Sequence, residues 1–213
     1  MKLSAKLICY HLQKSFHIRT SRLDAEPVLS CPACYEKDSP LLNGRIYLIT
    51  DPDFQFTFHH PRNILFLMVG AVYSSFELPQ PNICVIPEDI PANTVFNKLQ
   101  EIFLIYDQWN QSLMDSRLRN ASIQELLDLT DCIIPNPMML IGMDFTIIAS
   151  RNWELGDLSN SVLGSSENSW ALVDSLKQDA NYEEAFYKTG YFYYPGNDHA
   201  VPALCVNISN NDR

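Results

Sequence analysis

The clearest hydrophobic pattern in the chain lies in residues 94–117. Large apolar residues recur there at spacings that alternate between four and three: Val95, Leu99, Ile102, Tyr106, Trp109 and Leu113. This alternation predicts a long helix, because 3.5 residues per turn keep one stripe of side chains, here called the seam, facing a partner. We expect Leu99, Ile102, Tyr106, Trp109 and Leu113 to pair two copies of the chain in a homodimer. The alternative is that the seam packs on a sheet within one chain.

The polar residues around this stretch predict where the helix begins and ends. Asn93 or Thr94 can cap the first turn, just after a proline. The seam register runs on into polar Asn120, and S-I-Q-E at 122–125 has the form of a capping box. We therefore expect a break near residue 120 and a second helix over residues 123–133.

Apolar runs before the long helix predict the strands of a sheet. R-I-Y-L-I-T at 45–50 is rich in β-branched and aromatic residues. The runs at 63–70 and 82–87 are apolar without alternation, which is typical of strands covered on both faces. Phenylalanines alternate with polar residues over 54–58 and predict a half-buried edge strand.

These strands predict an α/β domain over residues 1–93. A helix over residues 3–16 precedes them, with Leu7 and Tyr10 among its inward side chains, and prolines make residues 19–41 irregular. The domain would hold three to four strands, and the pattern leaves their order open. Residues 94–133 follow as connecting helices.

The last part of the chain, residues 134–213, predicts a smaller antiparallel module. Two apolar runs, 138–142 and 145–150, indicate a β-hairpin, and 203–209 indicates a final strand. Short helices are expected at 170–177 and 182–187, and an aromatic, turn-rich segment at 191–199. Because the last strand needs neighbours to bury its apolar side chains, we expect a truncated portion of a longer protein. The whole is α+β.

Charge and composition narrow the function classes. The net charge is −10, and the first 22 residues hold five basic residues and no acidic one. Nucleic-acid binders normally carry a basic surface, so we expect DNA contact only through a segment absent from this chain. The sequence contains no run of eighteen apolar residues, so we expect no membrane-spanning helix. The first residues also lack the continuous apolar segment of a secretory signal. We expect a cytoplasmic protein that makes no membrane contact.

C-P-A-C at 31–34 is the one motif that suggests metal or redox chemistry. A redox C-x-x-C pair normally lies at the start of a helix, where the helix dipole lowers the pKa of the thiol. Here Pro40 leaves too little room for such a helix. A zinc site through Cys31 and Cys34 needs two more ligands, and Cys84, His59 and His60 are weak candidates because adjacent histidines in a strand face opposite ways. We expect no metal and no cofactor. A small metal-binding or redox protein that uses these cysteines is the alternative.

The sequence contains none of the nucleophile, nucleotide-binding or zinc-protease motifs, so we expect no enzyme activity. Aromatic residues in the last module can line a pocket for a small molecule. The ligand-binding candidates are Trp153, Trp170, Phe186 and Tyr191. The alternative is that these side chains are ordinary core.

The order of several segments resembles that of PucR-type bacterial transcriptional regulators. They are L-F-L-M-V-G, I-C-V-I-P, F-N-K-L-Q-E-I-F, Y-D-Q-W and the hairpin N-P-M-M-L-I-G-M-D-F-T-I-I-A-S. The resemblance implies an N-terminal sensory region with a PAS/GAF-like fold over 135–209. Two departures stand out: Gly142 replaces a common aspartate, with Asp144 two residues later, and the C-terminal helix-turn-helix is absent.

Together these features predict a non-catalytic sensory region of a cytoplasmic transcriptional regulator. It would bind an unidentified small molecule and transmit that event through the dimerising helix. A protein-interaction module without any ligand is a further alternative.

Overall fold

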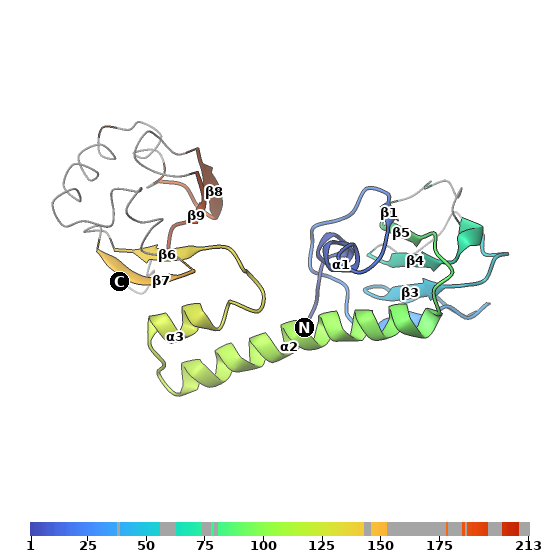
Figure 1. Cartoon of the computed structure of the whole chain (residues 1–213), viewed down its shortest axis with the longest axis horizontal. Helices are drawn as coiled ribbons and strands as arrows, with labels where there is room; N and C mark the ends of the chain where they lie inside the picture. The colour runs from blue at the N-terminus through green and yellow to red at the C-terminus, as the bar shows by residue number, and fades with distance from the viewer. Residues whose placement is uncertain are drawn as a thin grey trace. The chain divides into compact units, whose positions relative to one another are not determined.

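The computed structural model describes residues 1–37, 39–55, 63–73, 78, 81–142, 146–152, 178, 185, 187–195 and 202–208. It contains a five-stranded sheet, two two-stranded sheets and a long helix, in agreement with the predicted α+β class (Figure 1). The chain divides into two units, Met1–Asn120 and Ala121–Arg213. The helices expected over 94–133 are thus shared between the units at residue 120.

The first unit is built on the five-stranded sheet, in the order β1-β5-β4-β3-β2. Strands β2 to β5 are parallel, and β1 pairs with β5 in the antiparallel sense. The elements of this unit are α1 (Ala5–Leu12), β1 (Arg19–Thr20), β2 (Pro32–Cys34), β3 (Ile46–Ile49), β4 (Leu65–Val69), the 3-10 helix η1 (Ala71–Tyr73), β5 (Ile83–Ile86) and α2 (Ala92–Leu118).

The three predicted strands β3, β4 and β5 are confirmed, and every residue in them is buried. β4 is the central strand, which explains why its sequence is apolar without alternation. The prediction that residues 19–41 are irregular is wrong, because β1 and β2 lie there. Strands of two and three residues are too short to show a period of their own.

Apolar side chains cover both faces of this sheet. One face holds a cluster from the strands and their connecting loops: Tyr47, Ile49, Phe54, Ile64, Phe66, Met68, Tyr73, Ile83 and Val85. The opposite face carries Leu48, Leu67 and Cys84, which are aligned across β3, β4 and β5. Cys84 contacts Cys9 of α1 on this side, and α2 contacts both α1 and β2. The helices therefore cover the second face.

Helix α1 is shorter than the predicted span of 3–16. The Ser4 hydroxyl caps it by accepting a hydrogen bond from the Leu7 backbone N–H at 3.1 Å, so the helix starts at Ala5. Its buried side is formed by Ala5, Ile8, Cys9 and Leu12. The inward placement of Tyr10 was wrong, since 48% of this residue is exposed.

Helix α2 spans 27 residues and confirms the long helix. Its predicted side-chain caps are wrong: the N-cap is Pro91, and the backbone N–H of Thr94 donates to the Pro91 carbonyl at 2.9 Å. The predicted break is confirmed at Asn120, which has φ +54°. The capping box of Ser122 and Glu125 then starts α3 (Ile123–Asp128), which ends well before residue 133.

In the second unit, β6 (Met138–Ile141) and β7 (Ile147–Arg151) form the predicted hairpin. The predicted last strand is confirmed as β9 (Ala203–Val206), which pairs with β8 (Tyr191–Tyr194). β8 was missed, because its four consecutive aromatic residues were interpreted as part of a turn-rich segment. The helix expected at 170–177 falls outside the described residues, and of the helix expected at 182–187 only residues 185, which is helical, and 187 are described. Of the edge strand expected over 54–58, residues 54 and 55 are described and are not in a strand, while residues 56–58 fall outside.

Candidate functional site

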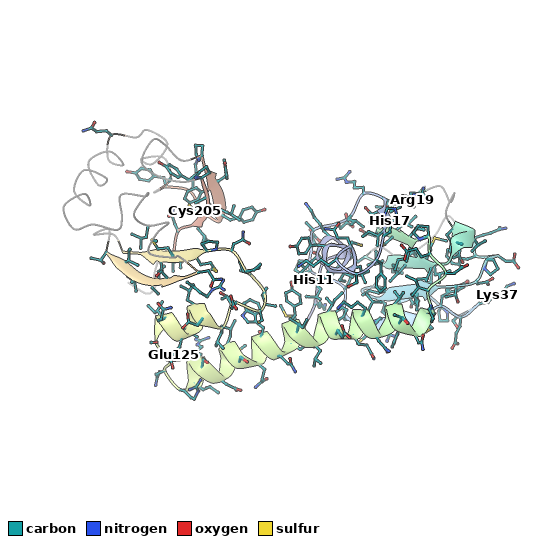
Figure 2. All side chains as sticks on the ribbon, in the orientation of Figure 1. His11, His17, Arg19, Lys37, Glu125 and Cys205 are labelled. Carbon is teal, nitrogen blue, oxygen red and sulfur yellow. The ribbon has the colours of Figure 1, made fainter. Side chains whose placement is uncertain are left out.

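The first half of the seam is buried within the first unit. Leu99, Ile102 and Tyr106 expose 0%, 2% and 4% of their surface. His11 lies on α1 (Figure 2), and its Nε2 is 2.9 Å from the Tyr106 hydroxyl in a hydrogen bond. The amino group of Met1 also forms an ion pair of 2.7 Å with Asp107. For these three seam residues, packing within one chain is what the structure shows.

The second half of the seam is less covered. Trp109 and Leu113 are half-buried, and the neighbouring Met114 and Leu118 are 54% and 82% exposed. The indole Nε1 of Trp109 is shielded from solvent and has no acceptor among the described residues. A buried indole N–H normally finds a partner, so this part of α2 has unused bonding capacity.

His11 is the titratable group of the α1–α2 contact. Its partial burial lowers the pKa of the imidazole below the usual 6.5, and the positive charges of Lys14 and Lys98 lower it further. The imidazole is therefore neutral at pH 7 and suited to share a hydrogen bond with the Tyr106 hydroxyl.

The carboxyl ends of β3, β4 and β5 form the edge where parallel sheets commonly bind ligands. Here the polar groups bond to one another. The Tyr73 hydroxyl donates to the Asp51 carbonyl, and burial, with a smaller contribution from Asp51, raises the pKa of Tyr73 to about 12. The Ala71 backbone N–H donates to Asp89 Oδ1 at 3.2 Å. These bonds tie successive loops together and leave these groups occupied.

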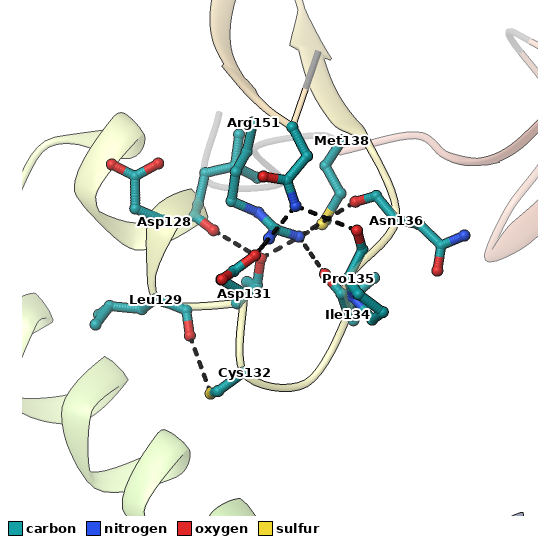
Figure 3. A network of polar contacts seen from close by, with 12 residues as sticks. Asp128, Leu129, Asp131, Cys132, Ile134, Pro135, Asn136, Met138 and Arg151 are labelled. Atoms are coloured by element: carbon teal, nitrogen blue, oxygen red, sulfur yellow. Dashed lines mark hydrogen bonds and ion pairs between the residues drawn. The ribbon is translucent and has the colours of Figure 1, made fainter. Parts of the chain in front are cut away.

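The densest polar network in the described part of the second unit surrounds Arg151, at the end of β7 (Figure 3). Arg151 is 7% exposed, forms an ion pair with Asp131 and donates to the carbonyls of Ile134 and Asn136, the latter at 3.3 Å. Asn152 Nδ2 donates to Asp131 Oδ1 at 3.1 Å. The planar guanidinium thus holds the loop between α3 and β6 against β7.

Helix α3 is attached to the same strand by an amide side chain. Gln124 Nε2 donates to the Ser150 carbonyl at 2.8 Å, and its Oε1 accepts from the Ser150 backbone N–H at 3.2 Å. Ser150 is paired with Met139 of β6, so Gln124 bonds to the edge of β7 that β6 does not cover. A shift of β7 is therefore coupled directly to α3.

Sequence reasoning missed both Arg151 and Gln124. The available signal for Arg151 was a charged residue directly after the apolar run I-I-A-S, where burial requires partners. For Gln124, the sequence shows only an exposed helix position.

Cys31 and Cys34 are exposed free thiols beside and within the edge strand β2. In an extended strand, positions three apart point to opposite faces, so this segment does not present both thiols to one ion. Among the described residues, no group of three or more His, Cys, Asp or Glu side chains could hold a metal. His59 and His60 lie outside those residues.

Of the four residues predicted to line a ligand pocket, only Tyr191 is among the described residues. Trp153, Trp170 and Phe186 fall outside the described residues, while Tyr191 lies on β8 and is 82% exposed. The pocket therefore stays a prediction.

In the described part of the chain, no helix is long and apolar enough to cross a membrane. Comparison of the sequence and structure with protein-family models, curated proteins and solved structures found no match.

Proposed function

We propose that the chain is a non-catalytic sensory region of a cytoplasmic transcriptional regulator, which binds a small molecule and signals through the pairing of two chains. Helix α2 is the observation that carries the proposal. It is fixed in the first unit by buried Leu99, Ile102 and Tyr106 and continues for twelve further residues, to Leu118. Those residues include half-buried Trp109 and Leu113.

The connection to the second unit supports a signalling role. Asn120 interrupts the helix, and α3 restarts at the capping box of Ser122. Gln124 then ties α3 to β7, and Arg151 ties β7 to the loop that follows α3. A ligand that favours one position of β7 would shift α3, and the short connection at Asn120 would pass the shift to the end of α2.

The pairing surface in this proposal is the part of α2 after Tyr106, because the earlier seam residues are already buried. Half-buried Trp109 and Leu113, with the exposed side chains of Met114 and Leu118, supply apolar area for this contact. This changes the mechanism expected from the sequence, in which the whole seam paired. The first half anchors the helix and the second half pairs.

Light scattering with native mass spectrometry tests the proposal. The unmodified chain should be a dimer that retains a small molecule, and Trp109→Ala with Leu113→Ala should weaken the dimer about tenfold or more. Lys98→Ala with Glu101→Ala, an exposed pair earlier on α2, is the control and should leave association unchanged. A dimer insensitive to the Trp109 and Leu113 changes, or a chain without any retained ligand, contradicts the proposal.

A further inference from the structure

The hairpin of β8 and β9 has apolar side chains on both of its faces. Side chains alternate along a strand, so Tyr191 and Tyr193 lie on one face and Tyr194 on the other. The register places Tyr191 opposite Val206 and Tyr193 opposite Leu204. Tyr194 is 7% exposed, so its face is packed against the unit. The other face is open.

We call this open surface the tyrosine face. It consists of Tyr191, Tyr193, Leu204, Val206 and Ile208, which are 82%, 64%, 74%, 59% and 77% exposed. It includes no charged residue. Four of them are neighbours on the sheet, and Ile208 lies two residues beyond the end of β9. Single exposed apolar residues are normal in proteins, but such a group of neighbours is not. A strand pair that is apolar on both faces is typical of one that is covered on both.

The size of the tyrosine face fits a protein partner. An aromatic side chain offers roughly 150–250 Å², and the two tyrosines are 82% and 64% exposed, so with the three aliphatic residues the face presents apolar area on the order of 500 Å². The largest apolar patch on a monomer is about 300–600 Å². A stable interface needs about 800 Å² per partner. The tyrosine face therefore lies at the upper end of the range for a monomer, where such patches are often functional, and it would form the apolar centre of a larger contact.

We propose that the tyrosine face pairs with the same face of a second copy of this chain. One uncharged apolar patch meets its own copy without any unpaired charge, as a two-fold interface requires. The chain carries a net charge of −10, so two copies repel over most of their surface and can approach best where charge is absent. Tyrosine is also enriched in interface cores. This surface uses no residue of α2 and does not depend on the proposed function.

Sedimentation equilibrium of matched charge variants tests this interface. Tyr193→Glu with Leu204→Glu places four carboxylates in the two-fold contact, so the dimer dissociation constant should rise by about a hundredfold or more. The control is Leu42→Glu with Val72→Glu, which adds the same charge at residues of the first unit that are 50% and 60% exposed. Its association should change by less than about threefold.

Two results would overturn the interface. One is unchanged association of the Tyr193 and Leu204 variant, which would move pairing to another surface such as α2. The other is a monomeric unmodified chain at about 100 μM, well above the dissociation constant of a standard-size interface. Hydrogen exchange of the unmodified chain guards against a misfolded variant: amides of 191–206 should gain protection as concentration rises. Protection independent of concentration would also contradict the proposal.

Discussion

The five-stranded sheet and the β8–β9 hairpin have the same kind of sequence but different surroundings. β4 is apolar throughout and buried on both faces, by loops on one side and helices on the other. β8 is aromatic throughout, yet only alternate residues are covered. The first sheet obtains its cover from its own unit. The comparison shows that the sequence of an apolar strand indicates whether one or both of its faces will be buried. It does not indicate whether the residues that bury them belong to the same chain.

The two units also differ in what holds their described parts together. In the first, buried side chains from α1, α2 and the sheet are nearly all apolar. In the second, buried Arg151 and the exposed residues that it bonds to form the main polar network that the structure describes. Apolar packing stabilises in proportion to area, while a buried charge depends on every partner being present. Substitutions in the two units should therefore differ in their cost to stability.

The largest effect is expected from Leu67→Ala in β4. Leu67 is 0% exposed, so the change leaves a cavity and should lower the free energy of unfolding by about 2–5 kcal/mol. Leu204→Ala in β9 removes a side chain that is 74% exposed and should cost less than about 0.5 kcal/mol in the monomer. Urea unfolding at low protein concentration measures both. Equal costs at the two sites would remove the contrast between the sheets.

Arg151→Ala should destabilise the second unit by about 1–3 kcal/mol, because the buried guanidinium that bonds to the carbonyls of Ile134 and Asn136 is lost. Arg151→Lys should restore little, since one ammonium cannot reproduce the planar fork. Asn152→Gly, at an exposed neighbour in the same network whose φ of +56° suits glycine, should cost about 1 kcal/mol or less. Hydrogen exchange of residues 129–151 reports on the local loss. If Arg151→Lys behaves like the unmodified chain, a positive charge alone is sufficient.

Ser122→Ala should weaken α3 by about 1 kcal/mol, because the hydroxyl accepts a hydrogen bond from the Glu125 backbone N–H at 3.2 Å. Ser122→Asn preserves an acceptor and should retain most of the stability. The readout is exchange of the amides of residues 123–128. Faster exchange in both variants would mean that the side chain acts through another contact.

The smallest effect is a pH dependence from His11. Its pKa is lowered in the folded chain, so the unfolded chain binds the proton more readily. The resulting stability is present above the unfolded pKa of about 6.5 and is lost as the pH falls through the lower, folded pKa. His11→Gln should remove this part of the pH dependence, measured as urea midpoints between pH 5 and pH 7.5. If His11→Gln leaves the pH dependence of stability unchanged, that dependence comes from other titratable groups.

Sequence reasoning was most successful where a pattern was long or had a local mechanism. The alternation of fours and threes predicted α2, and the reciprocal bonds of Ser122 and Glu125 predicted the restart at α3. It failed where the outcome depended on distant contacts. β1 and β2 exist through pairing with β5 and β3, and their two or three residues carry no period.

The candidate site was harder to predict than the fold. A seam that faces one side of a helix does not say which partner covers it, and only the position of α1 and the sheet shows that Leu99 and Tyr106 face inward. Arg151 and Gln124 could not be predicted, because their partners are backbone carbonyls and amides whose positions the sequence does not encode locally.

Hydrogen exchange of the unmodified chain at about 1 μM and about 100 μM tests the central claim, that two chains pair through surfaces left open in one chain. At the higher concentration, we predict slower exchange in residues 109–118 of α2 and in β8 and β9, while β3 to β5 stay unchanged. Exchange that is the same at both concentrations in every one of these segments would contradict pairing through either surface.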